Sequence, residues 1–176
     1  MGLDAPTRGY NEPVSDTRST QSPKTREATL DDSDGVHALA AQLAEIVGDD
    51  EPDAEQVRTR LEELLEEPRA RVIVAERETG IVGVATLWIK PDLAHGDTVV
   101  EVPMLAVAED ARHSGVGRQL ILSIRDIAVE HNAGLIELVA TRDNVAAQDF
   151  YRSLGFVEAD VIPLEFVGDI HNPPDK

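Results

Sequence analysis

The sequence predicts a mixed α/β (α+β) fold, with antiparallel hairpins in its first half and a βαβ-like crossover in its second half. The length of 176 residues suits one domain with short tails, since domains of about 100–150 residues are the most common. Stretches with helical apolar spacing alternate with β-branched runs, which is typical of this class. Only 3% of the residues are aromatic, so we expect an aliphatic core.

The two ends of the chain differ in composition from its middle. Residues 1–23 are rich in Pro, Ser and Thr and show no apolar period, which indicates a disordered N-terminal tail. The periodic part covers residues 24–167, and residues 168–176 read as a frayed C-terminal tail.

In the first part of the domain, a short strand over 26–30 is followed by two helices. The first helix begins at the acidic run 31–34, which can cap its amides, and ends near Val47 before Gly48. The second helix begins after Asp53, with Gln56 in capping-box spacing, and ends before Pro68.

The remaining elements are three strands, then a helix, a strand, a helix and a strand. The β-branched runs 71–76 and 81–90 form a hairpin. After a loop over 91–97, the strand 98–107 contains Pro103, which cannot donate to a ladder, so we expect an irregularity there. The later elements are a helix over 115–132, a strand over 135–141, a helix over 144–154 and a last strand over 156–166.

Charge and composition exclude several function classes. The formal net charge is −18, and the segment from Asp31 to Glu67 alone holds 13 acidic and 2 basic residues; such acidity argues against a nucleic-acid partner. With no cysteine, the sequence allows no disulfide, no thiolate metal site and no cysteine nucleophile. The five histidines show no ligand spacing, so we expect no metal. No bilayer-spanning run and no signal core are present, so we expect a cytoplasmic protein without a membrane partner.

The most informative segment joins the strand 98–107 to the next helix and reads Leu105-Ala-Val-Ala-Glu-Asp-Ala-Arg-His-Ser-Gly-Val-Gly-Arg118. At a strand-to-helix junction, unpaired amides and the positive end of the helix dipole converge, which favours an anion. Gly115 and Gly117 allow close backbone approach. Arg112, His113 and Arg118 add basic side chains in an otherwise acidic chain.

Two other glycine motifs do not fit this loop. The dinucleotide fingerprint needs a third small residue where Leu120 stands, and no βαβ unit precedes it. The NTP-binding P-loop motif does not occur.

The remaining pattern, Arg112-x-x-Gly115-x-Gly117, resembles the acyl-CoA loop of GNAT-type N-acetyltransferases. Downstream, Asn144-x-x-Ala-x-x-Phe-Tyr151-x-x-x-Gly-Phe156 resembles the second signature of that family. The resemblance covers about residues 26–166. It implies a largely antiparallel twisted sheet of about six to seven strands flanked by about four helices. It also implies a possible homodimer.

The resemblance implies a role for each matching residue. The backbone of Leu105, Ala106 and Val107 would pair with the pantetheine arm like an added strand. Asn144 would bind the pantetheine, and Tyr151 would protonate the departing thiolate. The CoA pyrophosphate would be held by the loop residues Arg112, His113, Ser114, Gly115, Val116, Gly117 and Arg118. Two residues depart from the usual pattern, His113 in place of glycine and Glu109 in place of proline, but neither removes a backbone donor.

The absence of cysteine favours direct attack of an amine on acetyl-CoA in a ternary complex, for which a base must deprotonate the amine. Glu101, on the strand entering the loop, is the first candidate for this base, and Glu137 is the second. Glu101 could instead be an ordinary solvent-facing strand residue. His95 and His131 are expected to be an exposed loop residue and a helix-end residue.

The acceptor follows less directly from the sequence. The acidic first helices can be an ordinary solvated face. In the family resembled they would wall the acceptor side, which favours a cationic small molecule. A protein or peptide N-terminus or lysine is the alternative acceptor. A non-catalytic acyl-CoA-binding regulatory module is the alternative function.

Overall fold

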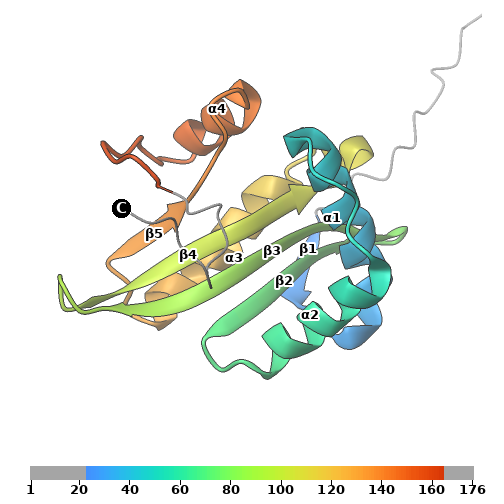
Figure 1. Ribbon diagram of the computed structural model, residues 1–176, viewed down its shortest axis with the longest axis horizontal. Helices are drawn as coiled ribbons and strands as arrows, with labels where there is room; N and C mark the ends of the chain where they lie inside the picture. The colour runs from blue at the N-terminus through green and yellow to red at the C-terminus, as the bar shows by residue number, and fades with distance from the viewer. Residues whose placement is uncertain (1–22, 165–176) are drawn as a thin grey trace, which may run out of the picture.

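The computed structural model describes residues 23–164, so the predicted tails lie almost wholly outside the described residues. Its sheet contains β1 (Lys24–Glu27), β2 (Ala70–Arg77), β3 (Gly80–Asp92), β4 (Asp97–Val107) and β5 (Leu135–Leu138), in that spatial order. The first four strands are antiparallel neighbours, and β5 runs parallel to β4 (Figure 1). This is the mixed α/β sheet that the sequence predicts.

The helices cover the two faces of the sheet unequally. Helices α1 (Ser33–Val47) and α2 (Ala54–Glu66) lie on one face, and α3 (Val116–Glu130) lies on the other (Figure 1). The helix α4 (Val145–Ser153) follows β5 and lies beyond the sheet, near the same end as α1. Two 3-10 turns, η1 (Leu30–Asp32) and η2 (Glu109–Ala111), precede α1 and α3. No helix of the described chain is long and apolar enough to cross a membrane.

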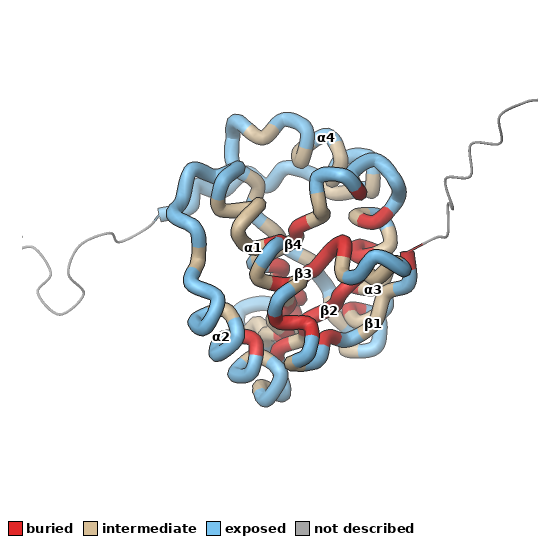
Figure 2. The backbone as a smooth tube through the Cα atoms, turned by 90° about the vertical axis from the view of Figure 1, so that its right-hand side faces the viewer, coloured by how far each residue is buried: buried red, intermediate tan, exposed pale blue. Residues whose placement is uncertain are grey.

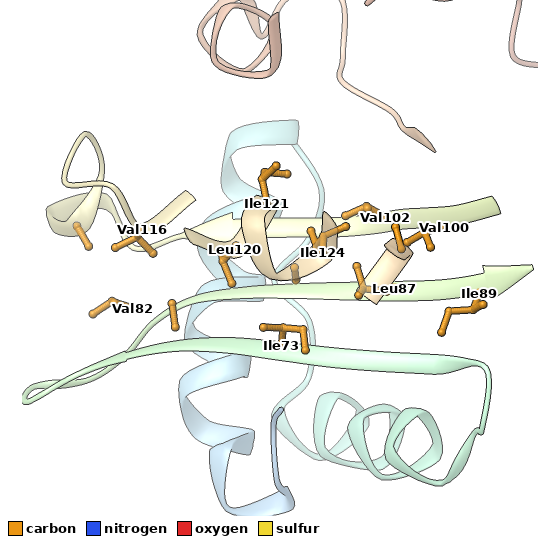
Figure 3. Close-up of a cluster of buried hydrophobic side chains, with 14 residues drawn as sticks. Ile73, Val82, Leu87, Ile89, Val100, Val102, Val116, Leu120, Ile121 and Ile124 are labelled. Carbon is orange, nitrogen blue, oxygen red and sulfur yellow. The ribbon is translucent and has the colours of Figure 1, made fainter. Parts of the chain in front are cut away.

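Each face of the sheet has its own aliphatic core. On the α3 face, the fully buried Leu87, Leu120 and Ile124 are central (Figure 3). On the α1/α2 face, a second cluster surrounds Leu39, Val74 and Val84. Buried backbone is concentrated in the central strands (Figure 2). Burial of branched aliphatic side chains on both faces accounts for the β-branched, nearly uninterrupted apolar runs of β2 and β3.

The predicted helix ends are confirmed in several places. The Asp53 carboxylate accepts a hydrogen bond from the Gln56 amide at 3.0 Å and so caps α2. Gly48 ends α1 in the left-handed conformation, at φ 81°. The expected irregularity at Pro103 is also present, because the β3–β4 register shifts between Thr86 and Trp88, opposite this proline.

The acidic run before α1 does more than cap the helix. Asp32 is only 8% exposed, and its carboxylate accepts hydrogen bonds from Arg26 Nη1 at 2.7 Å and Nη2 at 2.8 Å. It also accepts from the Thr29 amide at 2.7 Å. Arg26 bonds Glu76 as well, at 3.0 Å. These bonds lower the pKa of Asp32 to about 2, with Arg26 the main cause. Asp32 therefore links the start of α1 to the sheet.

The prediction of a last strand over 156–166 is wrong for its described part, residues 156–164, and the described sheet has five strands rather than six or seven. The β-branched residues of this segment are solvent-exposed, as Val157 (88%) and Ile162 (84%) show. Strand propensity stabilises a strand only when a neighbour completes its ladder, and Pro163 offers no amide. Smaller differences are a first strand at Lys24–Glu27 instead of 26–30 and a fifth strand that ends at Leu138 instead of 141.

Candidate functional site

The connection between β4 and α3 is a compact loop that exposes backbone amides. After η2, His113 (φ 58°) and Gly115 (φ 90°) both adopt the left-handed conformation and turn the chain into α3. Gly115 is the N-cap, so the first amides of α3, from Val116 on, have no acceptor within the helix. They point to the end of the helix where the dipole is positive, which is a suitable place for an anion.

Three basic side chains border this loop, as the sequence predicts. Arg112, His113 and Arg118 are all exposed. The Nε of Arg112 donates to the Val107 carbonyl at 3.4 Å, so its side chain folds back over the end of β4. This bond directly connects the loop with the strand that is predicted to bind pantetheine.

Within residues 23–164, the end of β4 that leads into the loop has no ladder partner on the side of β5. The parallel ladder joins residues 99–102 to residues 135–138 and goes no further. Beyond this ladder, β4 continues to Val107 while the chain after β5 turns away toward α4 (Figure 1). Pro103, which has no N–H, stands at the point of divergence. Among the described residues, the edge of Leu105–Val107 on this side therefore has no partner strand, and its Val107 carbonyl is engaged only by Arg112, so an extended ligand could pair with it.

Helix α4 packs its aromatic residues against the first turn of α3. A Cβ added at Gly117 would lie only 3.0 Å from Phe150 Cζ, so glycine is what allows this approach. The Tyr151 ring lies between those of Phe150 and Phe156, with centroids 5.2 and 5.7 Å away. Burial raises the pKa of the Tyr151 phenol, which keeps its proton on at neutral pH.

Asn144 caps α4, a role that the sequence pattern did not predict. Its Oδ1 accepts a hydrogen bond from the Ala147 amide at 3.1 Å. One lone pair of the oxygen is used in this cap, so its second lone pair and the side-chain NH2 are the groups that could contact pantetheine.

The two candidate bases lie side by side and share one lysine. Glu101 and Glu137 are register partners in the parallel β4–β5 ladder. Lys90 Nζ lies 3.0 Å from Glu101 Oε2 and 3.0 Å from Glu137 Oε1, and these carboxylates raise the lysine pKa. Strand alternation places all three on the face opposite α3, because their neighbours Ile89, Val100 and Ile136 pack toward α3. Lys90 escapes prediction because only the sheet register brings it to the two glutamates.

An open cavity of about 600 Å³ lies next to this cluster. Acidic and basic groups line it together: Lys90, Asp92, His95, Asp97 and Glu137, with Leu135 among the apolar residues. The exposed His95 Nδ1 lies 2.5 Å from Asp92 Oδ2, and Asp92 raises the pKa of this imidazole. His131 is the C-cap of α3, as its sequence position suggests.

The sequence also gives no indication of a contact made by the loop with the β2–β3 hairpin. Arg77 Nη2 donates to Ser114 Oγ at 2.6 Å, across 37 residues of chain. The Ser114 hydroxyl in turn donates to the Ala111 carbonyl.

The family model described as the acetyltransferase (GNAT) family matches residues 33–156. The aminoalkylphosphonate N-acetyltransferase of Salmonella typhimurium is 28% identical over 134 residues, which are 76% of this chain and 84% of that protein.

Two solved structures illustrate the likeness of fold. A putative acetyltransferase from Agrobacterium tumefaciens superposes with a TM-score of 0.73 at 24% identity, over 81% of this chain and 99% of that one. The ribosomal-protein-alanine N-acetyltransferase from Brucella melitensis gives 0.69 at 21% identity, over 84% and 100%. The structures show the fold alone. The family match, which covers more than half of the chain, shows that the chain belongs to the acetyltransferase (GNAT) family, and with the Salmonella typhimurium relative it shows an acyltransferase.

Proposed function

We propose that the protein transfers the acetyl group of acetyl-CoA to a primary amine by direct attack within a ternary complex. The observation that supports this most strongly is the free edge of β4 beyond the β5 ladder, which leads directly into the amide loop at the start of α3. A strand edge next to an anion site suits a ligand with an amide-bearing arm and a pyrophosphate.

In this proposal, the backbone of Leu105–Val107 pairs with the pantetheine arm. The amides and basic side chains of residues 112–118 hold the pyrophosphate, and the Asn144 side chain binds the arm. All of these groups belong to elements that meet at one end of β4.

The chemical step forms a C–N bond and breaks a C–S bond. The amine nitrogen attacks the thioester carbonyl carbon, and the CoA thiolate leaves. Tyr151 supplies the proton to the sulfur, a role that its raised pKa suits because the phenol stays protonated. With no cysteine in the sequence, no acetyl-thioenzyme on a cysteine is formed.

Glu101 is the proposed base that removes the proton from the attacking ammonium, directly or through a water. It lies near the end of the β4–β5 ladder, and its carboxylate is bound by Lys90 rather than buried among apolar groups. An incoming ammonium can take the place of the lysine, because both are cations that hydrogen-bond to the same oxygens.

The proposed acceptor is a cationic small molecule. Glu101, Glu137 and the acidic α1–α2 segment lie on the same face of the sheet, which favours attraction of a cation. Lys90 and His95, at the adjacent cavity, also favour a second candidate, an amine that carries an anionic group. The name of the Salmonella typhimurium relative, which refers to aminoalkylphosphonates, supports this second candidate.

Ligand binding is tested by thermal shift with acetyl-CoA, desulfo-CoA and NADH. A ligand at about 100 times its Kd stabilises the protein by about 2.7 kcal/mol, which raises Tm by several degrees. We expect a rise with both CoA compounds and none with NADH. No rise with either CoA compound would reject the binding site.

Catalysis is tested by thiol release with simple diamines and aminoalkylphosphonates as acceptors. Y151F is expected to lower kcat at least tenfold while the Kd of CoA stays unchanged. Y10F, at the only other tyrosine of the sequence, is the matched control. An acyl-CoA-binding module without activity would show no turnover in any variant.

The base is tested by comparing E101Q with E137Q. Each variant removes one of the two carboxylates that pair with Lys90. Only the variant that loses the base is expected to lower kcat/KM at least tenfold and to lose the fall of kcat/KM at acidic pH. The opposite ranking would transfer the role to Glu137.

A further inference from the structure

An arginine of the β2–β3 hairpin forms a hydrogen bond to the tip of the proposed CoA loop. Arg77, the last residue of β2, extends its guanidinium to Ser114, which stands between the two left-handed residues His113 and Gly115. Its Nε is buried and has no hydrogen-bond partner among the described residues. A surface arginine without a structural role would keep all its donors in water, since burying an unpaired donor is unfavourable.

A second hydrogen bond extends this contact toward the core, and we call the two bonds the relay. A serine hydroxyl has one hydrogen to donate, and that of Ser114 donates to the Ala111 carbonyl, so its oxygen is free to accept from Arg77 Nη2. Ala111 is buried against the α3 face of the sheet. The relay therefore connects the hairpin, the tip of the loop and the core.

We propose that Arg77 is a positioning residue, which holds the loop of residues 112–117 in its ligand-binding form by bonding the Ser114 hydroxyl. The inference rests on the proposed function for its effect on acetyl-CoA, but the contact itself is a property of the free protein. Left-handed backbone at a residue such as His113 is unfavourable without support. The bond from Arg77 supplies that support from outside the loop.

The first test measures steady-state kinetics with acetyl-CoA as the varied substrate. R77Q is expected to raise KM for acetyl-CoA about tenfold, the effect of losing one charge-assisted hydrogen bond, with kcat within about twofold of its original value. R125Q removes the same charge from an exposed residue of α3 and is expected to change neither constant. An R77Q enzyme that behaves like R125Q would overturn the proposal.

A double-mutant cycle separates positioning through Ser114 from a general loss of charge or stability. S114A is expected to raise KM, whereas S114T keeps the hydroxyl and restores most of the affinity. The R77Q/S114A double variant is expected to be no worse than the worse single variant, because both remove the same bond. Additive effects would show that Arg77 does not act through Ser114.

Amide hydrogen exchange of the free protein tests the contact without any ligand. The hydrogen-bonded amides that flank the loop belong to Ala111, Arg112 and Gln119, which donate to Ala108, Glu109 and Gly115. In R77Q, and more weakly in R77K, these amides are expected to exchange at least tenfold faster than in R125Q, while the amides of β3 stay unchanged. Equal loop exchange in R77Q and R125Q would refute the positioning role. If the unmodified protein binds no CoA compound, the proposed function fails, and this measurement still decides the role of Arg77.

Discussion

Replacing Asp32 by asparagine removes a buried carboxylate that receives two bonds from Arg26 and one from the Thr29 amide. In D32N the new side-chain oxygen can still accept from Thr29, but its NH2 faces guanidinium donors. Arg26 then retains Glu76 as its remaining carboxylate partner. The variant therefore tests what one ionised group contributes to the junction between β1 and α1.

The size of the effect follows from the pKa of Asp32, which falls from 3.8 to about 2 on folding. At 1.36 kcal/mol per pKa unit, the carboxylate stabilises the fold by about 2 kcal/mol at pH 7. Because the folded pKa is the lower one, this stabilisation is complete well above pH 3.8 and is lost as the pH falls toward 2. At pH 3 about 1 kcal/mol of it remains.

The assay is urea unfolding followed by far-UV circular dichroism, at pH 7, 5, 4 and 3, for the unmodified protein and D32N. We expect a difference in unfolding free energy of about 2 kcal/mol from pH 7 to pH 5, shrinking below pH 4. E76Q is the matched control, since Glu76 is 43% exposed and its loss is expected to cost about 0.5 kcal/mol. A loss of unfolding free energy in D32N that is smaller than the loss in E76Q, or that does not change with pH, would refute the reasoning.

Three further outcomes can be checked. L120A removes a side chain with no exposed surface and is expected to lower the unfolding free energy by about 2–5 kcal/mol in urea titrations; a loss below 1 kcal/mol would contradict the described core. G83A places a Cβ 2.8 Å from Val116 Cγ1, so a destabilisation of about 1–3 kcal/mol is expected, and an unchanged urea midpoint would show that α3 shifts freely. Raising the ionic strength from about 10 to 200 mM is expected to lower kcat/KM several-fold for a dicationic amine but not for a neutral one; equal salt responses would reject electrostatic steering.

Local signals account for most of the fold that the sequence predicts. Asp53 with Gln56 and the glycine at 48 mark helix ends through contacts within a few residues. The expected last strand over 156–166 differs, because local residue types carry no information about a partner strand. Residues 156–164 have the propensity but no ladder in the described sheet.

The candidate site shows the same division between local and long-range information. The loop from Arg112 to Gly117 can be predicted from the sequence, because the backbone conformation at the start of a helix depends on adjacent residues. Lys90 meets Glu101 and Glu137 only through the register of three strands, and Arg77 meets Ser114 only through the docking of a hairpin. Such contacts join residues far apart in sequence and leave no periodic or motif signal.

The separation of the core into two clusters, one on each face of the sheet, has an evolutionary consequence. The helix that begins at the amide loop rests on one cluster, and the acidic helices α1 and α2 rest on the other. Substitutions that reshape α1 or α2 therefore leave the packing around Leu120 and Ile124 undisturbed, because the strands stand between them. Under the proposed function, the acceptor side of the protein can therefore change during evolution while the proposed CoA-binding side keeps its packing.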